Sequence, residues 1–175
     1  SGPTGAQTQV RVRGAEANHT LVFIDGIAMN DPATSGEFRW ETLGSNGIAR
    51  AEVLRGPQSA LWGSEAIGGV VSVTTAEPSD GTRIFGSAEY GSFGTLHAAG
   101  GAGIGSERGG LVVQSSWYDT KGTDSFGGGI KERDGYESLM LSAKASVRPT
   151  ENGELGLVVR HTNSLSEFDG YNAFF

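Results

Sequence analysis

Four aspartates in the second half of the chain have the side-chain chemistry of a site for a hard cation. They are Asp119, Asp124, Asp134 and Asp169. Two of them open identical triplets, at residues 134–136 and 169–171, each reading Asp-Gly-Tyr. Carboxylate oxygens and backbone carbonyls are the ligands that Ca²⁺ takes in proteins. These residues are therefore candidate Ca²⁺ ligands in loops, and the alternative is that they are solvated acids.

The residues that could catalyse a reaction are scattered. The histidines are His19, His97 and His161, and the chain has no cysteine and no HExxH or GxSxG pattern. The glycine cluster at residues 100–110 fits neither form of phosphate-binding loop. The net charge of −7 argues against a nucleic-acid partner, which would require a basic patch. We expect a protein that is not an enzyme and has no cofactor apart from the possible Ca²⁺.

The elements that would position these residues fall into two parts. Residues 1–78 read as a mixed α and β unit, with strands predicted at residues 8–13, 20–27, 48–54 and 69–75 and a short helix at residues 58–62. The link at residues 56–68 is just long enough for a crossover between parallel strands. Residues 77–81 have the composition of a linker.

The second part alternates apolar and polar residues with a period of two. Leu139, Leu141 and Val147 would share one face of a strand, and Lys144 and Arg148 the other. Five strands are predicted, at residues 82–90, 95–104, 110–119, 138–148 and 154–163. Such strands are longer than the five or six residues common in globular proteins. Their length, with one long connection between short ones, favours a transmembrane barrel over a soluble sandwich.

Several features indicate a piece of a larger protein. No run of 18 apolar residues could form a transmembrane helix, and no signal peptide is visible at the start. Five strands cannot close a barrel in lipid, because the open edges would leave backbone groups unpaired. We expect further strands after residue 175 and a missing natural N-terminus.

Three motifs in order resemble the TonB-dependent outer-membrane receptors of the vitamin B12 and siderophore type. They are VRVRG at residues 10–14, LVFIDG at residues 21–26 and VLRGPQSALWGSEAIGGVVSVTT at residues 53–75. Trp62 stands where that family usually has tyrosine. The resemblance implies an α+β plug domain at residues 1–78. It also implies, at residues 79–175, the first five strands of a transmembrane β-barrel of about 22 strands, with external loops.

The resemblance further implies active uptake of a scarce ligand across the outer membrane of a Gram-negative cell. The ligand would be a vitamin B12-type corrinoid or an iron-siderophore, and the partners would be TonB at the periplasmic side and the outer-membrane lipid. Two alternatives remain open: a passive β-barrel of porin or adhesin type, and a soluble β-rich enzyme domain.

The site residues follow partly from this resemblance. A rigid apolar strand at residues 21–24 precedes an exposed polar loop, which is a common design for a binding site. The predicted ligand-binding residues of this plug loop are Met29, Asn30, Asp31, Glu37 and Phe38. The resemblance implies that Arg13 and Arg55 latch the plug to barrel glutamates beyond residue 175, and that Ca²⁺ orders the substrate mouth. Gly56, Gly63, Gly68 and Gly69 are predicted to allow positive φ and close packing of the plug against the barrel wall, and the alternative is that they are ordinary turn glycines.

Overall fold

The computed structural model describes residues 4–44, 47–124 and 133–167. The chain divides into two compact units, which we call the N-terminal unit (Gln7–Glu77) and the strand unit (Pro78–Phe175 with the first residues of the chain). None of the helices among the described residues is long and apolar enough to cross a membrane.

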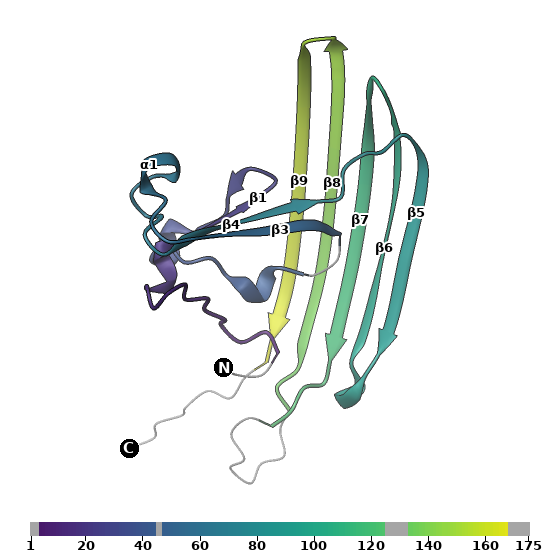
Figure 1. Ribbon diagram of the computed structural model, residues 1–175. Coiled ribbons are helices and arrows are strands. Elements are labelled where there is room, and N and C mark those ends of the chain that lie inside the picture. The colour runs from purple at the N-terminus through teal and green to yellow at the C-terminus, as the bar shows by residue number, and fades with distance from the viewer. Residues whose placement is uncertain (1–3, 45–46, 125–132, 168–175) are drawn as a thin grey trace, which may run out of the picture. The chain divides into compact units, whose positions relative to one another are not determined.

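The N-terminal unit is built on a sheet of four strands in the order β2-β1-β4-β3 (Figure 1). The strands are β1 (Thr20–Ile24), β2 (Ile27–Ala28), β3 (Ile48–Arg55) and β4 (Gly69–Thr75). The helix α1 (Ser59–Trp62) and three 3-10 helices, at Ala17–His19, Pro32–Thr34 and Trp40–Thr42, complete the unit. Strands β1 and β4 are inner strands whose residues are mostly buried, and the apolar run at residues 21–24 predicts this for β1.

The buried residues lie on both faces of this sheet. One cluster contains Val22, Ile24, Phe38, Val71 and Val73, and the opposite one contains Leu21, Ala66 and Val70. Alternate residues of a strand point to opposite faces, so β1 and β4 each contribute to both clusters. The prediction that residues 21–24 form a strand buried on both faces therefore agrees with the structure.

The strand predicted at residues 20–27 ends earlier than expected. Ile24 pairs with Ile27 across a two-residue turn in which Asp25 has φ 50° and Gly26 φ 80°. Positive φ at both central residues is the requirement of a type I′ hairpin, and Asp-Gly is among its preferred sequences. The Asp25 carboxylate also accepts hydrogen bonds from the Thr75 backbone N–H at 3.0 Å and the Thr75 hydroxyl at 2.7 Å. Asp25 thus joins this turn to the end of β4 by hydrogen bonds.

Two other predictions for this unit are wrong. Residues 8–13 form no strand, and β3 pairs with β4 antiparallel rather than through a parallel crossover. The link between them folds back on itself, because Gly56 N–H donates to the Gly68 carbonyl at 3.0 Å and Gln58 N–H to the Ala66 carbonyl at 2.8 Å. The parallel pair in this sheet is β1 with β4.

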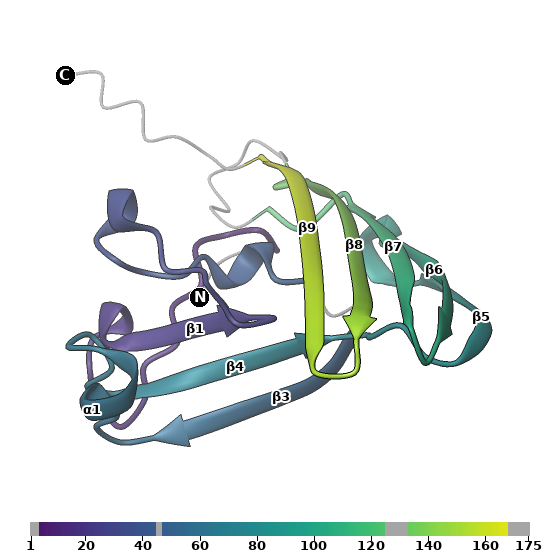
Figure 2. The same cartoon turned by 90° about the horizontal axis from the view of Figure 1, so that it is seen from above.

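The strand unit is a five-stranded antiparallel meander in the order β5-β6-β7-β8-β9, which confirms the predicted topology. The strands are β5 (Gly81–Tyr90), β6 (Leu96–Ser106), β7 (Gly109–Thr120), β8 (Tyr136–Thr150) and β9 (Gly153–Ser166), with a 3-10 helix at Ser92–Gly94. Each strand begins or ends within a few residues of its predicted limits. Figure 2 shows that the five strands follow an arc, as strands of a barrel wall do.

The register separates two chemically different faces. Cross-strand neighbours place Ile84, Val113, Ala143 and Val159 together on one face, which we call the apolar face. Leu139, Leu141 and Val147 lie on it, with 40%, 44% and 49% of their surfaces exposed. The opposite face, which we call the polar face, carries Arg83, Gln114, Lys144 and Arg160 by the same alternation.

Candidate functional site

The loop that follows β2 is held by the side chain of Asn30. Its Oδ1 accepts a hydrogen bond from the Val22 N–H at 2.8 Å. Its Nδ2 donates to the Thr20 carbonyl at 3.1 Å and to the Gly36 carbonyl at 2.8 Å. One carboxamide therefore joins strand β1 to both ends of the loop. Asn30 was predicted to bind a ligand, and in the structure its polar side-chain atoms form hydrogen bonds with the backbone.

Asp31 shapes the same loop. Its carboxylate accepts from the Ala33 N–H at 2.8 Å and so caps the 3-10 helix Pro32–Thr34. The loop closes as a small hairpin, because Asp31 N–H donates to the Glu37 carbonyl at 3.2 Å and Gly36 N–H to the Asp31 carbonyl at 3.0 Å. These bonds give residues 31–37 a defined shape.

The two apolar residues of the predicted ligand set face inward. Phe38 is 8% exposed within the core, and Met29 packs against the same cluster. The Phe38 ring meets Trp40 edge-on, with ring centres 5.1 Å apart. Apolar side chains placed in this way fix the base of the loop.

Residues 7–9, which we call the strap, are fastened to this loop by two carboxylates. Glu37 accepts from Gln9 Nε2 at 2.9 and 3.0 Å and from Gln7 Nε2 at 3.5 Å. Glu41 accepts from the Thr8 N–H at 3.2 Å and from Arg39 Nε at 2.8 Å. The sequence alone does not predict the contacts of Glu41, Arg39 and the strap, because nothing local in it marks contacts between residues about thirty apart.

The environment of Glu41 has opposing effects on its carboxyl group. Its side chain is 5% exposed, and this burial raises the pKa. The hydrogen bonds from Arg39, from its own backbone and from Thr8, with the charge of Arg39, lower it by more. The net result is a pKa below the ordinary value for glutamate.

We expect the strap to loosen in acid. A group whose pKa is lowered by folding stabilises the fold above its unfolded pKa, near 4.3 for glutamate, and this contribution disappears as pH falls through the folded value. Hydrogen exchange of residues 7–9 should therefore accelerate below about pH 4 beyond its intrinsic pH dependence. In Glu41→Gln this extra acceleration should be reduced, whereas Glu16→Gln, an exposed acid of the same unit, should retain it. An identical acid response in Glu41→Gln would contradict this assignment.

Arg13 and Arg55, the predicted latch, lie close to one short turn. A Cβ built on Gly56 would come 3.4 Å from Arg13 Nη1, so this guanidinium passes beside the residue that follows Arg55. Within residues 4–44, 47–124 and 133–167, neither arginine side chain has a hydrogen bond or an ion pair. Both remain available for the carboxylates that the prediction requires, and the latch stays a prediction.

The four predicted structural glycines divide into two kinds. Gly56 and Gly63 have φ of 103° and 97°, which side chains rarely tolerate. Gly68 and Gly69 sit in close contacts instead: a Cβ on Gly69 would lie 2.5 Å from the Leu54 carbonyl oxygen, and one on Gly68 2.9 Å from Ala15 Cβ. Gly68 and Gly69 are therefore required by packing within the N-terminal unit itself.

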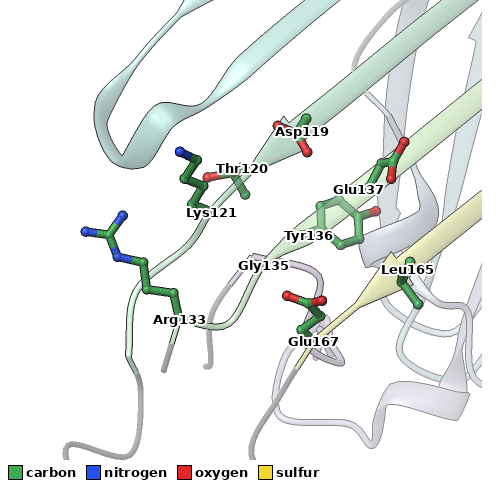
Figure 3. Close-up of a pocket in the computed structure, with 9 residues that line it drawn as sticks. All are labelled: Asp119, Thr120, Lys121, Arg133, Gly135, Tyr136, Glu137, Leu165 and Glu167. Carbon is green, nitrogen blue, oxygen red and sulfur yellow. The ribbon is translucent and has the colours of Figure 1, made fainter. Parts of the chain in front are cut away.

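A cleft of about 380 Å³ lies at the end of the strand unit where β7 and β8 meet their loops (Figure 3). Its lining includes Asp119, Thr120, Lys121, Arg133, Gly135, Tyr136, Glu137, Leu165 and Glu167. The nitrogen ends of Lys121 and Arg133 lie on the same side in Figure 3, and the carboxylate of Glu167 is separate from them. The cleft therefore offers both cations and carboxylates to a polar ligand.

The four aspartates predicted to bind Ca²⁺ have different surroundings. Asp119 pairs with Glu137 across β7 and β8, whereas Asp134 is 3% exposed at the base of the loop. Asp124 is exposed, and Asp169 lies outside the described residues. No group of three or more histidines or acids suited to a metal occurs in the part of the chain that the structure describes. Calcium binding remains a prediction.

The histidines are spread over the fold. His97 lies beside Tyr118 on the polar face, with ring centres 5.9 Å apart. His161 lies on the apolar face, in register with Leu141. His19 ends a 3-10 helix of the N-terminal unit.

Comparisons with known proteins agree with both units. Residues 1–70 match the family model of the TonB-dependent Receptor Plug Domain. The fold is similar to the siderophore receptor PirA of Acinetobacter baumannii, at 21% identity and a TM-score of 0.72, over 93% of this chain and 27% of that one. It is similar to the ferric enterobactin receptor PfeA of Pseudomonas aeruginosa, at 19% identity and a TM-score of 0.69, over 94% and 28%.

A third solved structure, the copper transporter OprC, matches at 17% identity and a TM-score of 0.77. The match covers 94% of this chain and 26% of OprC. The chain thus spans between a quarter and a third of the length of the solved receptors and transporters that it resembles.

Proposed function

We propose that this chain is part of a TonB-dependent receptor and takes part in TonB-dependent active uptake across the outer membrane, because residues 1–70 match the plug-domain model and the fold is similar to that of solved receptors and a transporter. Receptors of this family lie in the outer membrane of Gram-negative bacteria, and so does this protein. The observation that carries the proposal is the order of the two units. A matched plug domain is followed directly by a five-stranded meander with one apolar and one polar face.

The proposed cargo is an iron-siderophore or a vitamin B12-type corrinoid. The solved structures with this fold include two siderophore receptors and a copper transporter, which supports a metal chelate as the ligand. The plug side of the ligand site would be the loop of residues 29–38 with the strap. Of its predicted ligand residues, Asp31 and Glu37 are half-buried polar side chains, and Met29 and Phe38 would support the loop from below.

The remaining partners follow from the same proposal. TonB would supply energy from the periplasmic side, and Arg13 and Arg55 would hold the plug to the barrel until that energy arrives. Ca²⁺ would bind in the external loops of the strand unit through Asp119, Asp124, Asp134 and Asp169, of which Asp119 also lines the cleft. The polar face would line the lumen, and the apolar face would contact lipid.

Uptake by a deletion strain that expresses the complete receptor tests this proposal. We expect accumulation of one labelled ligand class, ferric siderophore or corrinoid, that stops when TonB is removed. The vector alone is the control for background, and a TonB-independent transporter in the same strain is the control for energy status. Accumulation that continues without TonB would favour a passive barrel, and no accumulation of either class would contradict the proposed cargo.

A further inference from the structure

A hollow of about 560 Å³ lies on the strand unit, over β6, β7, β8 and β9. Small residues form its floor and larger apolar residues its sides. The floor includes Gly100, Ala102 and Ala143, the sides are Val113, Leu141 and Val159, and His161 lies at one end. All of these residues belong to the apolar face, because cross-strand pairing joins them in two adjacent rows.

The shape of the hollow follows from residue size across the register. Ala143 is the cross-strand neighbour of both Val113 and Val159, so a methyl group stands between two larger side chains. Ala102 likewise stands between Ile84 and Val113. The surrounding side chains project strongly, with Ile84 80% and Leu157 62% exposed. The result is a depressed strip between projecting apolar groups.

His161 is unusual on the apolar face because its imidazole is polar. It follows Leu155 by six residues, which corresponds to a height of about 15 Å in a strand tilted by about 40°. The apolar band of an outer-membrane barrel is about 25 Å tall, so the imidazole would lie inside it. Strand β9 pairs with β8 alone among the described strands, and no described residue forms a hydrogen bond with this side chain. A polar group in hydrocarbon is costly unless it is hydrogen-bonded, and such residues tend to be functional.

We propose that the hollow binds one acyl chain of an outer-membrane lipid, and that His161 hydrogen-bonds an ester, amide or hydroxyl oxygen of the same lipid. Binding sites for small amphipathic molecules have this composition, mostly apolar with a few polar groups that fix orientation. A neutral imidazole can donate one hydrogen bond and accept another.

The occupant follows from the shape and the location of the hollow. The apolar face borders the bilayer, so lipid is its immediate neighbour. A flexible acyl chain can follow a depressed strip between projecting side chains such as Ile84 and Leu157. The wall of a second barrel is rigid, and the same projecting groups would hold it away from Ala143. Acyl chains alone offer the imidazole no hydrogen-bonding partner, whereas an ester, amide or hydroxyl oxygen of the lipid at this depth would provide one.

Photolabelling of the complete receptor tests the inference. The probe is a phospholipid with a diazirine on one acyl chain, mixed into vesicles that hold the receptor, and labelled peptides are mapped by mass spectrometry. Labels should concentrate on β7, β8 and β9 around the hollow. Ala143→Phe fills the floor and should abolish this concentration. Ala145→Phe makes the same change two residues along the same face, where Ala145 does not line the hollow, and should leave the labelling unchanged.

Variants of His161 test the hydrogen bond. His161→Leu should lower labelling of the hollow about two- to tenfold, the effect of losing one hydrogen bond. His161→Gln keeps a donor and an acceptor and should restore part of the labelling. Equal labelling in His161→Leu and the unchanged receptor would overturn the role of this residue.

Three outcomes would overturn the inference as a whole. The first is labelling spread evenly over the apolar face, which would indicate ordinary bilayer contact. The second is efficient disulfide cross-linking between two copies of Val159→Cys, which would make a second barrel the occupant. The third is unchanged labelling in Ala143→Phe. The inference rests on the proposed contact between the apolar face and lipid, and an absence of label from every part of this face would refute that contact instead.

Discussion

Replacing Leu141 by arginine should largely prevent assembly of the receptor in the outer membrane. Leu141 lies on the apolar face near the middle of β8, and 44% of its surface is exposed. An arginine on the lipid face of a barrel costs about 2–4 kcal/mol near the midplane. Because most proteins are stable by only about 5–15 kcal/mol, this cost removes a large part of the total. Heat-modifiable migration of the outer-membrane fraction measures the folded amount.

The matched control for this prediction is the next residue on the strand. Ser142 points to the polar face by the same alternation, so Ser142→Arg introduces the same charge on the opposite side. We expect near-normal levels of folded protein for this variant. Equal losses from the two substitutions would show that the faces are assigned incorrectly. Normal assembly of Leu141→Arg would show that the apolar face does not contact lipid.

Asn30→Ala should destabilise the plug loop even when no ligand is present. The substitution leaves the Val22 N–H and the Thr20 and Gly36 carbonyls without their carboxamide partner. A buried backbone group without a partner costs about 1–3 kcal/mol, so the total loss should reach several kcal/mol where water does not replace the amide. Hydrogen exchange and limited proteolysis of residues 29–38 in the complete receptor measure the effect directly.

Two variants separate this structural role from ligand contact. Asn30→Asp keeps an acceptor for the Val22 N–H but loses both donors, so it should be nearly as unstable as Asn30→Ala. Glu65→Ala removes an exposed side chain elsewhere in the same unit and should leave residues 29–38 protected. If Asn30→Ala weakened ligand binding with no change in hydrogen exchange, Asn30 would be a ligand contact as the sequence alone suggests.

The sequence by itself determined the elements whose periodicity is local. The alternation of Leu139, Met140, Leu141 and Ser142 gives the two faces of β8, since successive side chains of a strand point in opposite directions. The apolar run at residues 21–24 predicted that strand β1 is buried. The three motifs at residues 10–14, 21–26 and 53–75 indicated the family that residues 1–70 then matched. Both units of the fold could be expected in this way.

The pairing of β3 with β4 was decided only by tertiary structure. A period of two shows which face of a strand is buried, but it does not show which strand is the neighbour or in which direction that neighbour runs. The link of residues 56–68 is long enough for a crossover, and it folds back instead through the bonds of Gly56 and Gln58. Strand order depends on such contacts between distant residues.

The roles of the polar side chains were likewise decided by tertiary structure. Asn30, Glu37 and Glu41 have groups that could bind either a ligand or the chain itself, and the sequence does not distinguish these uses. In the folded unit, Asn30 bonds to the backbone and the two glutamates bond to the strap. The reason is that a buried N–H or carbonyl must find a partner, and the available partner is set by which segments the fold brings together.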